Sequence, residues 1–260
     1  MNKEYLDFAT SLAHQAGDIM LAHFQFGVSY ERKADKTHLT IADTAINKMV
    51  VDKVASTFPE HRVLGEEESS VANDSEFVWV CDPIDGTTSY VFGLATNVFS
   101  LVLVHKGIPL LGVVYDPHMK RLFTAEKGQG AYMNGERLRV NSLTVEESVI
   151  GCTGKRSKTV DSAGLHAAIE RTAHRMMFLG CVVYEGMLTA AGHMGGHVYS
   201  GSNPYDGVAS ALFVKEAGGK VTNLLGEDQK YDREIKGIVA TNGVVHDDIL
   251  RLVQKSLLQK

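Results

Sequence analysis

The sequence predicts a layered protein of mixed α/β class, in which amphipathic helices cover mixed sheets. The first half carries two helical apolar patterns and then a run of short apolar strands, whereas the second half alternates strands with helices. The chain has 260 residues, which is enough for a large core in one or two domains. No repeat or Pro/Gly/Ser-rich linker divides it. We therefore expect two closely packed halves, residues 1–142 and 143–260.

The first half is expected to begin with two helices. Apolar side chains recur at helical spacing from Glu4 to Phe24. A second helix is expected to begin near Asp43 and to run to Phe58, where Pro59 stops it. The unbroken apolar run of Phe77–Cys81 predicts a strand buried on both faces. Turn residues separate it from the other expected strands, which are Val63–Leu64, Val98–Val104, Leu110–Tyr115 and Arg121–Ala125.

The second half is expected to form a smaller sheet with its own helices. Short apolar runs and helical patterns alternate along it, and Gly218-Gly219 ends one of the helices. The expected strands are Val149–Gly151, Met176–Val183 and Ile238–Ala240, and the expected helices are Asp161–Ala173, Val183–Ala191, Asp206–Ala217 and His246–Leu258.

Composition argues against several classes of protein. The chain is 44% hydrophobic and 22% charged, as in an ordinary soluble globular protein. Its net charge of −5 includes no basic block, so we expect no nucleic-acid polymer as a partner. No run is long enough to span a membrane, and the N-terminus does not resemble a signal peptide. Cys81, Cys152 and Cys181 lack CxxC spacing, which favours reduced thiols and a cytoplasmic location.

The segment Trp79–Thr88 is the most informative part of the chain. An apolar strand delivers Asp82 and Asp85 onto a Gly-Thr-Thr turn. Two crowded carboxylates repel each other unless cations lie between them. Pro83 predicts a sharp turn instead of a continuing strand. Gly86 allows close approach, and the backbone N–H groups and hydroxyls that follow can bind an anion. The segment therefore predicts divalent metal ions beside a phosphate-binding turn.

Three further acidic positions accompany this segment. Glu66 and Glu67 follow a short strand, Asp43 lies at an expected helix N-cap, and Asp206 begins a later helix. Taken singly, the aspartates are typical of helix caps and the glutamates of a solvated turn. Together with the Asp-Pro-Ile-Asp-Gly-Thr-Thr run, they indicate one acidic site.

These motifs resemble the inositol monophosphatase family of lithium-sensitive, magnesium-dependent phosphatases. Trp79–Tyr90 is similar to the family's first signature, and Tyr205–Gly219 is similar to its second. The resemblance covers nearly the whole chain, because further family-like elements are Thr40–Asp43, Gly65–Glu67, Gly128–Gly135 and Asn242–Gly243. It implies a layered αβαβα sandwich of the inositol monophosphatase and fructose-1,6-bisphosphatase type, usually assembled as a homodimer.

The resemblance also implies a phosphoric monoester hydrolase that uses two or three Mg²⁺ ions and no covalent intermediate. Water activated by the metal ions would attack the phosphate. Thr87 would orient this water and pass a proton toward Asp43, and Glu67 is the third catalytic residue implied. The implied metal ligands are Glu66, Asp82, the Ile84 carbonyl, Asp85 and Asp206. The implied substrate-binding residues are Gly86, Thr87, Thr88, Gly180 and Cys181.

Departures from the family pattern bear on the substrate. Ser89 and Tyr205 replace the usual Asn and Trp, while Tyr199 and Met177 stand where members that cleave inositol phosphates tend to carry Glu and Arg. The expected substrate is a small polyol or sugar phosphate, with inositol 1-phosphate first. Histidinol phosphate, fructose 1,6-bisphosphate and 3′-phosphoadenosine 5′-phosphate remain alternatives, as does a non-catalytic regulator with the same fold.

A histidine pair was also weighed as a metal site. His193 and His197 have i, i+4 spacing, which on a helix could bind a transition metal. The glycines around them argue against a helix, so we expect surface or pocket lining instead.

Overall fold

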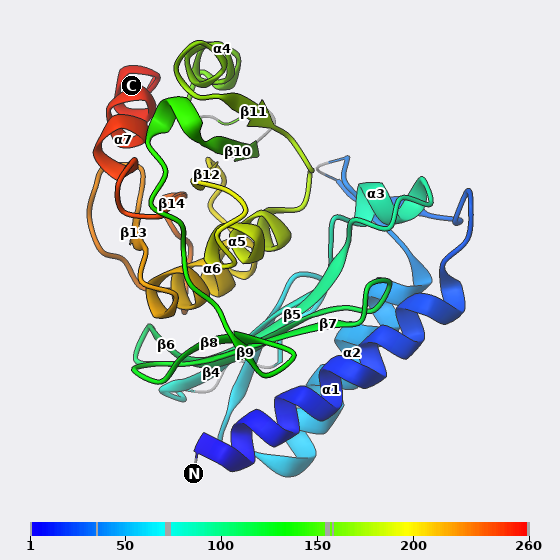
Figure 1. The fold of residues 1–260 in the computed structure, drawn as a ribbon. Helices are drawn as coiled ribbons and strands as arrows, with labels where there is room; N and C mark the ends of the chain where they lie inside the picture. The colour runs from blue at the N-terminus through cyan, green and yellow to red at the C-terminus, as the bar shows by residue number, and fades with distance from the viewer. Residues whose placement is uncertain (1, 35, 71–73, 154–156, 158, 259–260) are drawn as a thin grey trace.

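The computed structural model has five layers that alternate between helices and sheets (Figure 1). It describes residues 2–34, 36–70, 74–153, 157 and 159–258. In order, the layers are helices α1 and α2, a seven-stranded sheet, helices α5 and α6, a five-stranded sheet, and helices α4 and α7. The helix bounds are α1 Asn2–His23, α2 Ile41–Thr57, α3 Thr87–Val91, α4 Ser162–Thr172, α5 Val182–Ala190, α6 Pro204–Glu216 and α7 His246–Lys255. The predicted αβαβα sandwich is confirmed.

The larger sheet belongs entirely to the first half of the chain. Its strands follow sequence order, and all neighbours are antiparallel except the first pair, β3 and β4. The bounds are β3 Arg62–Gly65, β4 Phe77–Asp85, β5 Val98–His105, β6 Ile108–Asp116, β7 Arg121–Glu126, β8 Gly130–Met133 and β9 Glu136–Arg137. A separate hairpin of β1 Glu31–Arg32 and β2 His38–Leu39 precedes it and was not predicted.

The apolar runs of this sheet are unbroken because both of its faces are covered. Along β5, Val102 and Val104 face the core that includes α5 and α6. Leu101 and Leu103 face the opposite core, under α1 and α2. Successive side chains of a strand point to opposite faces. A strand between two helical layers therefore needs apolar residues at every position.

Strand β4 continues further than the sequence predicted. The expected turn at Pro83 is wrong, because the strand runs on to Asp85 with an irregular register between Asp82 and Asp85. A bulge places a residue outside the ladder of hydrogen bonds, so a proline without an N–H is tolerated there. The bulge keeps both carboxylates on one strand.

The five-stranded sheet has the order β11-β10-β12-β14-β13 and mixes parallel and antiparallel pairs. The expected strand Met176–Val183 is wrong, because β11 ends at Met177 and α5 begins at Val182. Strands β12 and β13 were not predicted. The bounds are β10 Val149–Thr153, β11 Arg175–Met177, β12 Gly196–Tyr199, β13 Lys220–Thr222 and β14 Ile238–Thr241, and a 3-10 turn, Val145–Glu147, precedes them.

Strand β12 contains one member of the histidine pair that was a candidate metal site. His197 lies on this strand and is fully buried, so the expected surface or pocket position is wrong for it. Burial lowers the pKa of His197 to about 3, so the ring stays neutral. His193 lies in the exposed loop before the strand.

The described helices include none that is long and apolar enough to cross a membrane. The division at residue 142 stays a prediction. The last strand of the larger sheet ends at Arg137, and the first strand of the smaller sheet begins at Val149.

One carboxylate links helix α6 to the larger sheet. Glu216 accepts hydrogen bonds from the backbone N–H groups of Gly128, at 2.7 Å, and Gly130, at 2.8 Å. These two glycines flank the turn between β7 and β8, and both have positive φ. The glutamate of the second signature thus holds the glycine turn of the first half.

We expect Glu216→Ala to destabilise the protein. The change removes both acceptors of the Gly128 and Gly130 N–H groups, and the loss of such hydrogen bonds costs about 1–3 kcal/mol in unfolding free energy. Urea denaturation measures this cost, with the exposed Glu146→Ala as a matched control. Equal stability of the two variants would contradict a structural role for this link.

Candidate active site

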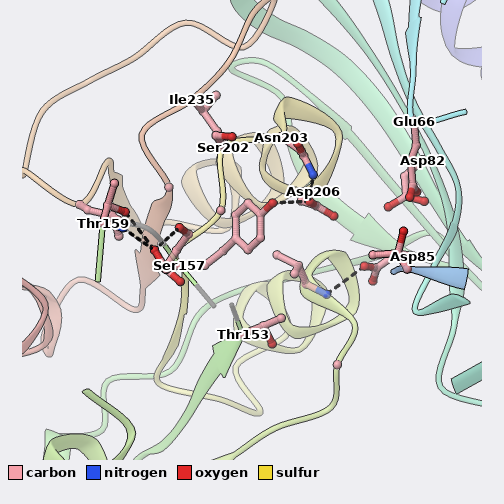
Figure 2. Close-up of a pocket in the computed structure, with 18 of the residues that line it drawn as sticks. Glu66, Asp82, Asp85, Thr153, Ser157, Thr159, Ser202, Asn203, Asp206 and Ile235 are labelled. Atoms are coloured by element: carbon pink, nitrogen blue, oxygen red, sulfur yellow. Dashed lines mark hydrogen bonds between the residues drawn. The ribbon is translucent and has the colours of Figure 1, made fainter. Parts of the chain in front are cut away.

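A pocket of about 1020 Å³ opens where the two halves meet (Figure 2). Glu66 and the segment from Asp82 to Thr88 line it from the first half, and the segment from Tyr199 to Asp206 lines it from the second. The volume is at the upper end of the roughly 300–1,000 Å³ typical of ligand pockets. Both family-like signatures therefore contribute to one cavity.

Three carboxylates converge at one end of this pocket. Oxygens of Asp82, Asp85 and Asp206 lie within 4.8 Å of one another. Asp82 and Asp85 are only 1% and 4% exposed. Oδ1 of Asp82 is buried and has no hydrogen-bond partner among the described residues. Such an orphaned oxygen beside two like charges fits a divalent cation, since hard cations bind carboxylate oxygens.

Backbone amides of helix α5 hold Asp85 in place. Its Oδ1 accepts from the N–H of Val182 at 2.9 Å, and its Oδ2 accepts from the N–H of Tyr184 at 3.1 Å. The first N–H groups of a helix have no partner within the helix, so a carboxylate there satisfies them. The second half of the chain thus orients a carboxylate of the first.

Burial raises the pKa of all three carboxyls, because the charged form loses its hydration. Neighbouring carboxylates add to the shift, chiefly Glu66 for Asp82 and Asp206 for Asp85. The pKa of Asp206 rises to about 7, although a hydrogen bond from Tyr199 opposes the rise. The metal-free site therefore holds protons near neutral pH.

Asp206 lies in the first turn of α6 and is held by two side chains. The Tyr199 hydroxyl and the Asn203 amide nitrogen both donate to its Oδ2, the latter at 3.2 Å. Asn203 occupies the N-cap position of the helix, and Pro204 is its first residue. Tyr199 was weighed only as a lost polyol contact, yet here it positions a carboxylate of the site.

Glu66 and Glu67 follow β3 and share one ammonium group. Nζ of Lys33 donates to Glu66 at 2.8 Å and to Glu67 at 2.7 Å. Burial raises the pKa of Glu67 to about 7 in spite of the hydrogen bond from Lys33. Lys33 follows β1, far away in sequence, so no spacing pattern could have indicated it.

Asp43 and Thr87 are brought together, as the resemblance implies. The Thr87 hydroxyl lies 3.4 Å from Oδ1 of Asp43 and 3.0 Å from the carbonyl oxygen of Ile84, to which it donates. Burial raises the pKa of Asp43 to about 6. The expectation that Asp43 is an N-cap is wrong. Thr40 is the cap, and Asp43 at position N3 closes the capping box.

Gly86 has a positive φ of 88° and packs directly on Cys181. A Cβ at this position would collide with Sγ of Cys181 and come within 2.9 Å of the Thr96 carbonyl oxygen. Only glycine allows this approach without strain. Cys181 is fully buried and stands behind the turn, whereas its neighbour Gly180 lines the pocket.

Thr88 differs from its neighbour Thr87 in its surroundings. Its side chain is exposed, and its hydroxyl lies 3.1 Å from Nδ1 of His38 in the β1–β2 hairpin. The substrate, metal and catalytic assignments of all these residues stay predictions, because the structure records their positions alone.

The whole chain matches the family model of the inositol monophosphatase family, over residues 1–258, and the protein belongs to that family. The Thermotoga maritima fructose-1,6-bisphosphatase/inositol-1-monophosphatase is 32% identical over 96% of both chains. The Nus factor SuhB of Escherichia coli is 31% identical over 85% of both chains.

Solved structures agree with this membership. The inositol monophosphatase from Thermotoga maritima has a TM-score of 0.88 at 30% identity, and each chain covers 97% of the other. The inositol monophosphatase from Anabaena has a TM-score of 0.85 at 28% identity over 98% of each chain. The layered mixed fold and the family resemblance are therefore confirmed.

Magnesium is expected to raise the melting temperature, and to raise it more at pH 8 than at pH 5.5. The carboxyls of the metal-free folded protein have raised pKa values, so stability falls as pH rises from about 4, where unfolded carboxyls titrate, through about 7. A cation at the three carboxylates relieves this loss.

Thermal melts with and without Mg²⁺ at both pH values measure the difference. Hydrogen exchange should show the first turn of α6 loosening most without the ion. A magnesium shift that is equal at the two pH values would contradict a site made of these carboxyls.

Proposed function

We propose that this protein is a magnesium-dependent phosphomonoesterase that acts on a small polyol or sugar phosphate. The convergence of Asp82, Asp85 and Asp206, from both halves of the chain, carries the proposal. Glu66 lines the same pocket, and the Gly86–Thr87 turn adjoins it. Carboxylates beside a turn that opens a helix, here α3 after Gly86, suit metal ions and a phosphate together.

The ligands that fit Mg²⁺ here are Glu66, Asp82, Asp85, Asp206 and the carbonyl of Ile84, enough for two ions or three. When bound, the ions supply positive charge that activates a water and stabilises the leaving alkoxide. The backbone at Gly86 and Thr87 orients the phosphate, and Thr88 and Gly180 complete its surroundings.

Thr87 and Asp43 handle the proton of the attacking water. The Thr87 hydroxyl faces the pocket and lies between Ile84 and Asp43. It would accept a hydrogen bond from the water and turn its own proton from the Ile84 carbonyl oxygen toward Asp43. With a pKa of about 6, Asp43 can take up a proton near neutral pH. Glu67, held by the same Lys33 as Glu66, is the third group assigned to this relay.

Inositol 1-phosphate is the first substrate to test, and fructose 1,6-bisphosphate is supported by the name of the Thermotoga maritima relative, a fructose-1,6-bisphosphatase/inositol-1-monophosphatase. Histidinol phosphate and 3′-phosphoadenosine 5′-phosphate complete a panel. Turnover with Mg²⁺, measured as phosphate release, ranks the four esters. Release from none of them would refute the enzyme and leave a regulatory protein, a role that the name of the SuhB relatives raises.

The same proposal includes inhibition by lithium, assembly as a homodimer and a cytoplasmic location. Li⁺ is expected to inhibit by taking the position between Asp85 and Asp206. Sedimentation that shows only monomer would reject the dimer.

Thr87→Ala is expected to lower kcat about 10²-fold or more, as the loss of a group that assists proton transfer does. Metal affinity should be retained, because the side chain is not a proposed ligand. Calorimetry with Mg²⁺ and steady-state kinetics separate the two effects. Full activity at saturating Mg²⁺ would show that the water is activated by another group.

Asp82→Asn is expected to nearly abolish turnover, because Asp82 is assigned to two metal positions at once. The Mg²⁺-dependent rise in melting temperature should also shrink. Asp52→Asn, at an exposed ion pair on α2, is the matched control and should change neither quantity. Retention of more than about a tenth of wild-type kcat/KM would contradict a role of Asp82 at two metal positions. The transition-state stabilisation lost would then be below about 1.36 kcal/mol, the value of a tenfold change in rate.

A further inference from the structure

A row of hydrogen-bonded side chains joins the amides that hold Asp85 to a turn of the larger sheet. The backbone N–H of Tyr184 donates to Oδ2 of Asp85 at 3.1 Å, while its hydroxyl donates to Oδ2 of Asp116 at 2.7 Å. Arg121 donates to the oxygen of the same hydroxyl at 2.9 Å. Asp116 ends β6 and Arg121 begins β7, whereas Tyr184 lies in the first turn of α5. One residue thus connects a carboxylate of the site to the β6–β7 turn.

The hydrogen bonds on the Tyr184 hydroxyl are charge-assisted and shielded from water. Asp116 is fully buried, and Tyr184 is only 6% exposed. A buried carboxylate depends on its donors, because without them it loses its hydration and gains nothing in return. Burial raises the pKa of Tyr184 to about 12, so the hydroxyl keeps the proton that it donates. The phenol is therefore fixed in one orientation.

The turn that receives Tyr184 is itself held in place. The other oxygen of Asp116, Oδ1, accepts from the backbone N–H groups of His118 and Met119, both at 3.0 Å. Nε2 of His118 lies 2.9 Å from Oδ1 of Asn97, which is fully buried immediately before β5. Strands β6 and β7 pair up to the turn. Tyr184 is therefore attached to a rigid part of the larger sheet.

A second buried side chain holds the start of α5 independently. Oε1 of Glu185, which is fully buried, accepts from the backbone N–H of Leu179 at 3.0 Å. The N–H of Glu185 donates to the carbonyl of Cys181 at 3.0 Å, as the first turn of the helix requires. Loss of the Tyr184 hydroxyl should therefore shift the first turn of α5 without unfolding the helix.

We propose that Tyr184 is a positioning residue for the metal site. Through Asp116 and Arg121 it fixes the N–H groups at the start of α5 on Asp85, and it thereby sets the affinity for Mg²⁺. This inference rests on the proposed function, because Asp85 is assigned there as a metal ligand. Tyr184 is not among the described residues that line the pocket, so it acts through Asp85 alone.

Tyr184→Phe tests this role, because it removes the hydroxyl and keeps the packing of the ring. Calorimetry should show that the Kd for Mg²⁺ rises about tenfold, the lower end of what the loss of a partner of a metal ligand costs. The kcat at saturating Mg²⁺ should change far less, since the ligands and Thr87 are all retained. An unchanged Kd would overturn the proposal.

Tyr231→Phe is the matched control. Tyr231 lies between β13 and β14, is 4% exposed, belongs to the same apolar core as Tyr184 and does not line the pocket. Its loss of a buried hydroxyl should lower the stability in urea but leave the Kd for Mg²⁺ unchanged. An equal rise of the Kd in both variants would show a general effect of a weakened core and would refute the proposal.

Arg121→Met provides a second variant at a partly buried side chain on β7. It removes one donor to Tyr184 and leaves the bond to Asp116, so the Kd for Mg²⁺ should rise less than in Tyr184→Phe. Added to Tyr184→Phe, it should cause no further rise, because both changes act through the same hydroxyl. Fully additive effects would contradict this row of hydrogen bonds.

Hydrogen exchange of the metal-free protein gives a readout that requires neither Mg²⁺ nor turnover. The N–H groups of Val182 and Tyr184, which hold Asp85, should exchange faster in Tyr184→Phe than in the wild type or in Tyr231→Phe. Unchanged exchange at both would refute the positioning role. Failure of the wild type to bind Mg²⁺ would refute the proposed function, whereas equal Mg²⁺ affinity of the wild type and Tyr184→Phe would refute this inference alone.

Discussion

Three carboxylates stand within 4.8 Å of one another in a region that is largely shielded from water. Asp82 and Asp85 come from the larger sheet, whereas Asp206 comes from α6, the helix between β12 and β13 of the smaller sheet. Their mutual repulsion opposes the very contact that joins the two halves of the chain. The apolar core between the sheets must therefore outweigh it, or cations must neutralise it. The core is extensive here, since α5 and α6 bury a continuous apolar cluster against the larger sheet and β13 and β14 of the smaller one.

The backbone features around the site reduce the cost of this crowding. The bulge in β4 keeps Asp82 and Asp85 on one strand and frees Pro83 from the ladder. Amides at the start of α5 stabilise the Asp85 carboxylate, and Gly86 lets the turn rest against Cys181. Lys33 draws Glu66 and Glu67 together from outside the sheet. The α5 amides and Lys33 each satisfy carboxylates that would otherwise be buried alone.

The same arrangement gives a role to one departure from the family pattern. The hydroxyl of Tyr199 donates to Asp206, so this side chain positions a carboxylate of the site. Its ring then forms part of a wall that continues into leucine and isoleucine side chains.

The local pattern of residues was enough to predict layered helices and mixed sheets, most helices of both halves and the acidic segments, whereas the five-layer order came from the resemblance to the family. Hydrophobic periodicity and the signature motifs are local properties, so they can be read without knowing the fold.

The same reasoning misplaced the Asp43 cap by three residues, broke β4 at Pro83 and missed β12. In β4 and β12, pairing with neighbouring strands overruled propensity and turn chemistry, because it supplies hydrogen bonds and burial that a short segment lacks. The link from Lys33 to Glu66, the amides that hold Asp85 and the walls of the pocket join residues far apart in the chain. Such contacts arise only when the two sheets pack on the shared helices, because no spacing along the sequence encodes a distance across the core.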